Sequence, residues 1–246
     1  GILQAIKSEL LEKNIAAKYR DPENFWYGLS MRARIIAVSK SYPNPENLSY
    51  ADLAKPEWKG KVLMRSSDNI YNQSLVAGII AHVGEDSAQK WVDAVHANFA
   101  REPKGGDTDQ IRAIAAGEGE ITVANSYYIG KMARSEEALD KEALAAVNLV
   151  FPKDVNMNTH VNISASGVVK YAPHKENAVK LLEFMSRPEN QALFFEHNQE
   201  YTVAQTVPEQ KNFDALGTLT PDTLALGTLG IYQPKAVSLF EKTGWM

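Results

Sequence analysis

Short apolar strands that alternate with amphipathic helices most strongly restrict how this chain can fold. The segments 61–65 and 120–125 have the apolar composition of buried strands, and helical spacing fills 72–83, 86–99 and 109–116 between them. Such alternation predicts an α/β fold with parallel sheets, whose ligands bind beyond the carboxyl ends of the strands. A functional site is therefore expected at the strand ends.

The beginning of the chain does not follow this alternation. Apolar residues within 2–11 recur at helical spacing, which predicts an opening helix rather than a first strand. The next strand is expected at 29–39. Further strands are expected at 149–152 and 161–170, before a helix at 177–185.

The composition excludes several classes of protein. With 246 residues, 44% apolar and 23% charged, the chain is long enough for one large or two medium domains. The net charge of −4, without a basic cluster, argues against nucleic-acid binding. No apolar run approaches the length that a bilayer requires, so no direct membrane insertion is expected. The absence of cysteine excludes disulfides, thiolate metal sites and cysteine nucleophiles, and it fits an oxidising compartment.

Three tyrosines stand at the expected strand ends. Tyr127 and Tyr128 directly follow the strand at 120–125, and Tyr71 follows the strand at 61–65 close to a helix start. Phenolate oxygen is a hard, anionic ligand that suits a hard trivalent cation, and three phenolates neutralise such a charge in a partly dry cleft. Tyrosine is also common at strand ends for packing, with its ring buried and its hydroxyl in water. The pattern alone leaves both interpretations open.

The remaining motifs give little support to an enzyme. The segment 105–108 (GGDT) precedes a helix and could bind an anion at free N–H groups, but it lacks phosphate-loop spacing and is also typical of an ordinary N-capped turn. None of the five histidines is paired at i, i+4. No nucleophile motif or close carboxylate pair occurs.

Several segments resemble a known family. They are 65–75 (RSSDNIYNQSL), 98–101 (NFAR), 106–116 (GDTDQIRAIAA), 125–128 (NSYY), 159–170 (THVNISASGVVK) and the ending 243–245. In them the sequence resembles the periplasmic ferric-ion-binding proteins of bacterial iron ABC importers, in particular the branch with a tyrosine-rich site. The resemblance runs along essentially the whole chain.

The resemblance implies a metal site. In the family, the tyrosine of the first segment and the tyrosine pair of the NSYY segment bind the metal. The resemblance therefore implies that Tyr71, Tyr127 and Tyr128 are ligands of Fe3+ here. The family also places basic residues near the iron, for which Arg32 and Lys131 are expected by position. The implied partners are ferric ion and the membrane permease of an iron ABC importer. The implied location is the periplasm, or extracellular with a lipid anchor before processing.

The resemblance also implies an architecture. The family fold is that of type II solute-binding proteins, with two α/β domains joined by crossing hinge strands and the metal in the cleft. The hinge is expected at 29–36 and 159–166, domain one at 1–36 and 159–246, and domain two at 37–158. Family members begin with a strand that carries a His-Tyr pair, and the opening of this chain matches a segment well inside that domain. Domain one is therefore expected without its N-terminal strands and with core surface exposed.

Two other functions remain open at this point. A protein of the same fold could hold another small solute, an organic cation or an oxyanion, with the tyrosines stacking or hydrogen-bonding. An α/β enzyme would need a nucleophile or an acid/base pair that the sequence does not display.

Overall fold

The structure is a computed structural model, and its contacts divide the chain into two units. It describes residues 1–205 and 218–246. In that part of the chain, unit 1 has residues 1–32 and 162–205, and unit 2 has residues 33–161 and 218–246. The main hydrophobic core lies in unit 2.

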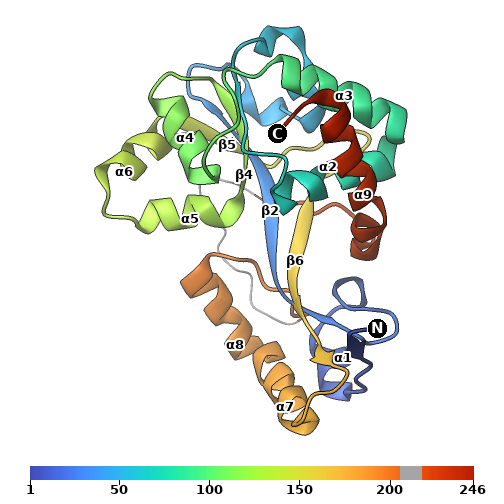
Figure 1. The fold of residues 1–246 in the computed structure, drawn as a ribbon. Helices are drawn as coiled ribbons and strands as arrows, with labels where there is room; N and C mark the ends of the chain where they lie inside the picture. The colour runs from blue at the N-terminus through green and yellow to red at the C-terminus, as the bar shows by residue number, and fades with distance from the viewer. Residues whose placement is uncertain (206–217) are drawn as a thin grey trace. The chain divides into compact units, whose positions relative to one another are not determined.

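Two paired strands belong to both units. They are β2 (Tyr27–Ser39) and β6 (Val161–Ser166), and the chain crosses from one unit to the other within each of them (Figure 1). The expected hinge segments, 29–36 and 159–166, overlap these strands. The hinge at these strands stays a prediction.

A mixed sheet forms the centre of unit 2. Its strand order is β3-β4-β2-β5, in which β3 is Val62–Leu63, β4 is Ile121–Asn125 and β5 is Val147–Val150. β3 and β4 are parallel, whereas β4 and β5 are both antiparallel to β2. The α/β class is confirmed. The parallel sheet is not, because the long strand β2 inserts between β4 and β5 and runs against both.

Helices cover both faces of this sheet (Figure 1). One group contains α2 (Ile70–Val83), α3 (Glu85–Ala97) and α9 (Leu226–Thr243). The other contains α4 (Asp107–Ala115), α5 (Ser126–Arg134) and α6 (Ala138–Ala145). Because both faces are covered, the inner strands are buried along their length, and every residue of β4 is buried.

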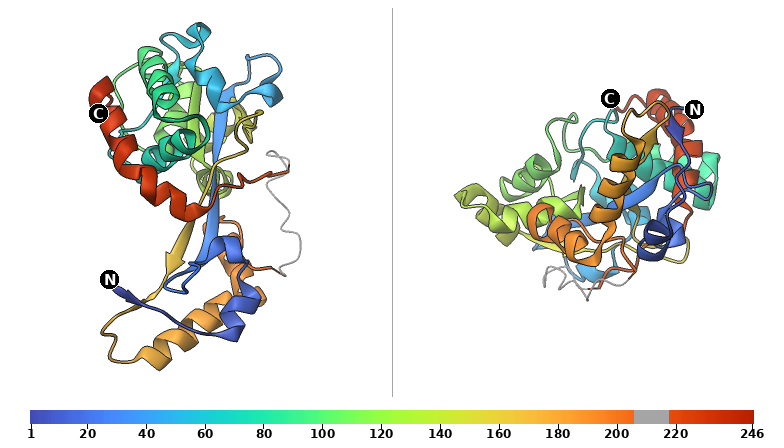
Figure 2. Two further views of the ribbon diagram at one scale, coloured as in Figure 1. Left: turned by 90° about the vertical axis from the view of Figure 1, so that its right-hand side faces the viewer. Right: turned by 90° about the horizontal axis from the view of Figure 1, so that it is seen from below.

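The C-terminal helix α9 belongs to unit 2. It packs against α2 and α3, as the ribbon shows from different sides (Figure 1, Figure 2). Trp245, after the helix, packs edge-on against Phe240 and Phe99, with ring centroids 4.8 and 4.9 Å apart. By these contacts residues 218–246 group with 33–161, whereas the sequence-based division places them in domain one. Apolar spacing marks the buried face of a helix but not the core that buries it.

Unit 1 opens on a strand rather than on the expected helix. β1 (Leu3–Gln4) pairs antiparallel with β7 (Val168–Val169), and the carbonyl of Ile2 accepts a hydrogen bond from the N–H of Lys170 at 2.8 Å. The helix α1 (Glu9–Asn14) begins only after Ser8, whose Oγ accepts from the N–H of Leu11. The prediction of a helix across 2–8 is wrong because pairing with a distant strand extends this backbone.

The other elements of unit 1 are helical. They are α7 (Lys175–Ser186), α8 (Pro188–Leu193), a 3-10 turn at Ala17–Tyr19 and a π turn at Phe194–Asn198. Unit 2 has further 3-10 turns at Pro45–Asn47, Tyr50–Ala54 and Pro56–Trp58. Across the described residues, no helix combines the length and the apolar character needed to cross a membrane.

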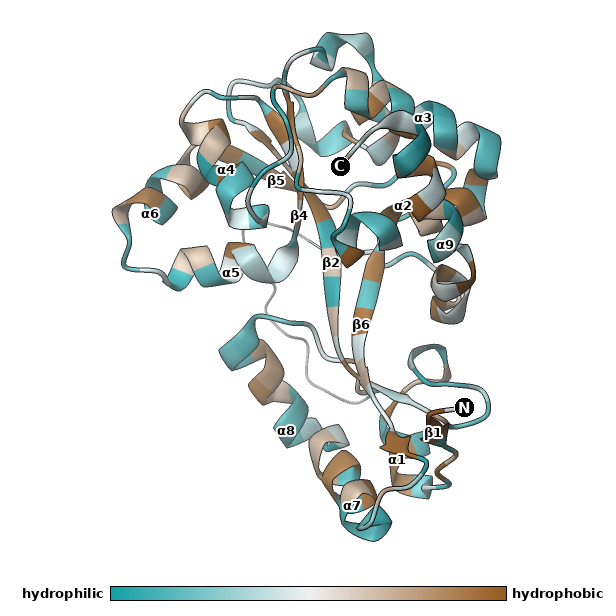
Figure 3. Cartoon of the chain, in the orientation of Figure 1, coloured by the Kyte–Doolittle hydropathy of each residue, from teal (hydrophilic) through white to brown (hydrophobic). Residues whose placement is uncertain are grey.

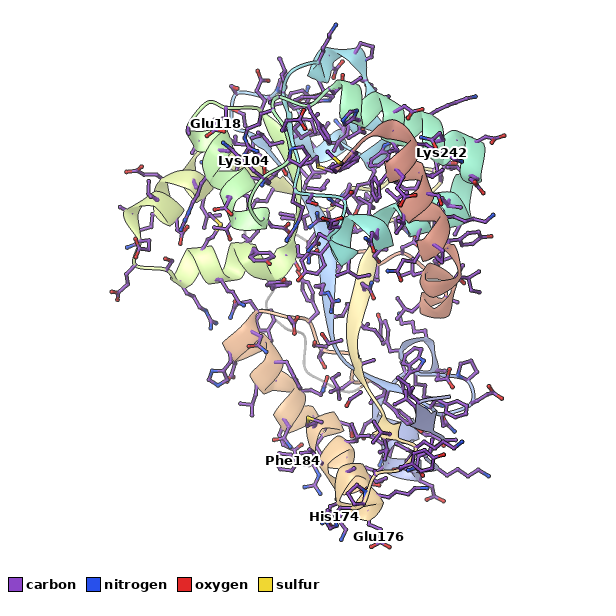
Figure 4. All side chains as sticks on the ribbon, in the orientation of Figure 1. Lys104, Glu118, His174, Glu176, Phe184 and Lys242 are labelled. Carbon is purple, nitrogen blue, oxygen red and sulfur yellow. The ribbon has the colours of Figure 1, made fainter. Side chains whose placement is uncertain are left out.

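Helix α7 leaves apolar side chains in solvent. Leu182 is buried and Ser186 accepts a hydrogen bond from Asn14 of α1 at 3.1 Å, so this face is packed. Leu181 and Phe184 are 56% and 53% exposed. Figure 3 shows apolar stretches on this helix, and Figure 4 labels Phe184.

Candidate metal centre

The first tyrosine is positioned by the N-terminus of α2. Asn69 is the N-cap of this helix, and its side-chain oxygen accepts a hydrogen bond from the backbone N–H of Tyr71 at 2.9 Å. The cap fixes where the helix begins and therefore the direction of the Tyr71 side chain in its first turn. Tyr71 is half-buried.

The tyrosine pair lies in the first turn of α5, which follows β4 without a loop. β4 ends at Asn125 and α5 begins at Ser126, whose Oγ accepts from the backbone N–H of Ala33 on β2 at 3.2 Å. The rings of Tyr127 and Tyr128 lie 4.3 Å apart between centroids, at an interplanar angle of 32°. In a strand, the adjacent side chains of Tyr127 and Tyr128 would point to opposite faces of the sheet. Because the helix begins directly after β4, they do not.

The structure brings the three tyrosines together. The hydroxyls of Tyr71 and Tyr127 share a hydrogen bond at 2.9 Å, although they are 56 positions apart in the sequence. The ring of Tyr128 lies against that of Tyr127, and its proximity contributes to the raised pKa of Tyr127. Tyr127 is therefore the central member of a group of three neighbouring tyrosines, which we call the tyrosine cluster.

Burial raises the pKa of the central tyrosine. The main cause for Tyr127 is desolvation of its phenolate, and the proximity of Tyr128 and the hydrogen bond with Tyr71 add to it. In the absence of a cation Tyr127 is therefore a neutral phenol at neutral pH. A bound trivalent cation would reverse this balance by stabilising the phenolate.

Of the two basic residues expected near the metal, Lys131 lies against the tyrosine cluster. It is one turn after Tyr127 on α5, and its Nζ is 5.1 Å from the centre of the Tyr127 ring. Arg32 lies on β2 in unit 1, and its Nη1 donates to Ser164 Oγ at 2.9 Å. A role for Arg32 near the metal stays a prediction.

Arg65 is a neighbour of the tyrosine cluster that the sequence did not indicate. It follows β3, and its guanidinium carbon is 5.1 Å from the centre of the Tyr71 ring. Burial by itself lowers the pKa of Arg65, but the negative charge of Asp107, its hydrogen bond and the proximity of Tyr128 raise it by more. Arg65 is therefore a permanent positive charge beside the ring of Tyr71 and near Tyr128.

A buried ionic network supports this arrangement. Asp107, at the N-terminus of α4, has no solvent exposure, and its Oδ2 accepts from Arg34 Nη1 at 2.5 Å and from the N–H of Asn125 at 2.7 Å. Its Oδ1 accepts from Arg65 Nη1 at 3.0 Å. Arg34, 2% exposed, also donates from Nη2 to Asn72 Oδ1 at 2.8 Å. The network joins β2, β4, α2 and α4 beneath the tyrosine cluster.

One signal could have found this network. Arg34 stands in the middle of an apolar strand, and a buried charge must be paired. The sequence does not identify its partner, because an aspartate such as Asp107 in the first turn of a helix is as typical of an exposed position as of a buried ion pair.

The GGDT segment forms the N-capped turn rather than an anion cradle. Asp109 Oδ2 accepts from the backbone N–H of Gly106 at 2.7 Å, and Gly105 has the positive φ of 71° that favours glycine. The carboxylate of Asp109 thus occupies the position that an anion would take. Asp107 points into the buried network instead.

Two other observations on the described residues of unit 2 bear on where a metal could bind. A cavity of about 670 Å³ lies beside β5, and none of the three tyrosines is among its described lining residues. Among the described residues, no group of three or more histidine, aspartate or glutamate side chains is placed to hold a metal ion. The tyrosine cluster is therefore the strongest candidate.

Comparison with known proteins identifies the class of this protein. Residues 1–218 match the family model of bacterial extracellular solute-binding proteins, and the chain belongs to that family.

Its relatives include iron uptake protein A1 of Synechocystis sp., which is 43% identical over 246 residues, covering 100% of this chain and 68% of the relative. The structure of Trichodesmium FutA (IdiA) in complex with iron and citrate matches with a TM-score of 0.94 at 43% identity, covering 100% of this chain and 78% of that one. Ferric iron-binding protein A of Mannheimia haemolytica, in an open conformation, matches with a TM-score of 0.92 at 39% identity, covering 99% and 77%. The resemblance to ferric-ion-binding proteins and the two-domain solute-binding fold are thereby confirmed.

Proposed function

We propose that this protein binds ferric iron in the periplasm and delivers it to the membrane permease of an ABC importer. The observation that carries the proposal is the tyrosine cluster, in which the hydroxyls of Tyr71 and Tyr127 are hydrogen-bonded and the ring of Tyr128 lies against that of Tyr127. The names of the relatives, an iron uptake protein and ferric iron-binding proteins, support it. So does their family, whose members are extracellular solute-binding proteins.

In this proposal the three tyrosines are the metal ligands that this chain supplies. Three phenolates carry three negative charges, which neutralise Fe3+ and remove most of the cost of holding a trivalent ion in a partly dry site. Lys131 and Arg32 are the basic residues near the iron, as expected by position. The protein acts as a carrier and not as an enzyme, as do relatives named for iron uptake and ferric-iron binding.

A spectroscopic titration tests the proposal. Adding ferric citrate to the purified metal-free protein is expected to produce a visible absorption band, because phenolate bound to Fe3+ gives charge-transfer absorption. Gallium(III) citrate is the matched control, since Ga3+ is also a hard trivalent cation but has no such transition. A protein that stays colourless with ferric citrate, yet gives a calorimetric signal with a polyamine or an oxyanion, would instead carry another solute on the same fold.

Ferric binding is expected to release protons and to weaken as the pH falls. Tyr127 has a raised pKa and is neutral without metal, so its ligation must displace a proton. Each proton released makes the apparent affinity fall about tenfold per unit of decreasing pH. A pH-stat titration measures the protons released per iron, relative to a blank without protein. Tyr127→Phe is expected to release about one proton fewer. An affinity that does not change with pH would contradict tyrosine ligation.

A further inference from the structure

One guanidinium group contacts one of the three proposed ligands and lies near a second. The guanidinium carbon of Arg65 is 5.1 Å from the centre of the Tyr71 ring, and Tyr128 is near enough to raise the pKa of Arg65. The same group donates through Nη1 to Asp107 Oδ1 at 3.0 Å. Its side chain is 17% exposed, so most of it lies inside the protein.

We propose that Arg65, held in place by Asp107, is a positioning residue that fixes the side chain of Tyr71 for metal binding. The inference rests on the proposed function, since it concerns the same site. It assigns to Arg65 a role beyond that of a nearby positive charge, namely to hold the Tyr71 ring in one geometry before the metal arrives.

Asp107 cannot follow a movement of Arg65, because its carboxylate is fixed from three directions. Its other oxygen accepts from Arg34 and from the backbone N–H of Asn125 at the end of β4. A carboxylate with charge-assisted hydrogen bonds on both oxygens and no solvent exposure is held firmly. Asp107 therefore provides a rigid support for the guanidinium.

The backbone of Arg65 is held as firmly as its side chain. Its carbonyl accepts hydrogen bonds from Asn72 Nδ2 at 3.0 Å and from Trp245 Nε1 at 3.2 Å. Asn72 adjoins Tyr71 on α2, so the same contact ties the loop after β3 to the helix that carries one ligand. The residue is thus fixed at both ends.

The planar guanidinium is suited to this role in a way that lysine is not. It presents donors in a rigid fork, so it can bond a carboxylate while it lies near an aromatic ring. A lysine has a single ammonium on a flexible chain and cannot keep both contacts. Asp107 offsets only part of the charge of Arg65, because the same carboxylate also pairs with Arg34.

Three variants test the inference on the full chain. Arg65→Gln removes the charge and the fork, and Arg65→Lys keeps the charge without the fork. Arg101→Gln is the matched control: the Arg101 side chain is also 17% exposed and also bonds an acid, Glu118, at 2.7 Å. The measurements are the position of the ferric absorption band, the rate of iron loss to excess chelator, and the melting temperature of the metal-free protein.

Both Arg65 variants are expected to bind iron with a shifted band and to lose it about tenfold faster or more, with Arg65→Lys less affected than Arg65→Gln. Arg101→Gln is expected to match the wild type in band and release rate. A role in folding alone predicts a lower melting temperature without a band shift. If Arg65→Gln fails to fold, the result with Arg65→Lys decides whether the inference holds, because a lysine at this position still gives Asp107 a positive partner.

The inference is overturned if Arg65→Lys equals the wild type in both band and release rate, or if it differs no more than Arg101→Gln. That result leaves the proposed function intact, because the wild type still binds iron. A wild-type protein that binds no ferric ion rejects the proposed function itself, and with it the role of Arg65. The two failures are therefore distinguishable.

Discussion

Tyr127→Phe is expected to lower the affinity for ferric iron by about a hundredfold or more and to weaken the charge-transfer band. Binding free energies of protein metal sites with four ligands are of the order of 10–16 kcal/mol, so one ligand contributes roughly 3 kcal/mol, which is about a hundredfold. Tyr127 is the central member of the tyrosine cluster, and its hydroxyl is hydrogen-bonded to that of Tyr71. Loss of this hydroxyl therefore removes one ligand and the hydrogen bond that ties Tyr71 to the tyrosine pair.

Tyr127→Phe removes the hydroxyl and keeps the ring, so it tests the hydroxyl alone. Phenylalanine keeps the aromatic contact with Tyr128 at 4.3 Å, so packing in the first turn of α5 is retained and the fold is expected to remain intact. Tyr171→Phe is the matched control, because Tyr171 is 85% exposed and lies in unit 1. Equal affinity and equal colour in Tyr127→Phe and Tyr171→Phe would show that the cluster serves packing only.

The candidate ligands could be found from the sequence because they are local features. Tyr71, Tyr127 and Tyr128 each follow a strand by a few positions, and short-range spacing is what a single sequence shows best. The resemblance then selected the metal interpretation over packing. Only the structure shows that Tyr71 meets the other two, because that contact depends on how β3 and β4 pair.

The supporting residues could not be found in the same way. Arg34 and Asp107 are 73 positions apart, and a contact at that separation leaves no trace in periodicity or composition. The same limit explains the fold-level differences. The pairing of Leu3 with Val169 overrides the helical spacing at the start of the chain, and α9 joins unit 2 through contacts with α2. Long-range pairing decides each of these features.

Asp107→Ala is expected to cause a large loss of stability, about 3–5 kcal/mol, because it leaves a buried charge without its partner. Arg34 is 2% exposed, and the carboxylate of Asp107 is the one negative charge to which it is bonded among the described residues. Removing one member of a buried pair leaves the cost of burying the other uncompensated. Arg65 loses the same partner but is partly exposed, so its charge can be solvated.

Denaturant unfolding of the metal-free protein measures this loss, with Glu118→Ala as the matched control. Glu118 also pairs with an arginine, Arg101, and has Lys104 nearby, but it lies at the surface (Figure 4). Water and salt screen such exposed pairs, so Glu118→Ala is expected to change the unfolding free energy far less. The double variant Arg34→Met with Asp107→Leu is expected to recover only part of the stability, because the buried charge of Arg34 is gone but Arg65 and the N–H of Asn125 still lack their acceptor. A loss in Asp107→Ala no larger than that in Glu118→Ala would show that the buried network does not hold β2, β4 and α4 together.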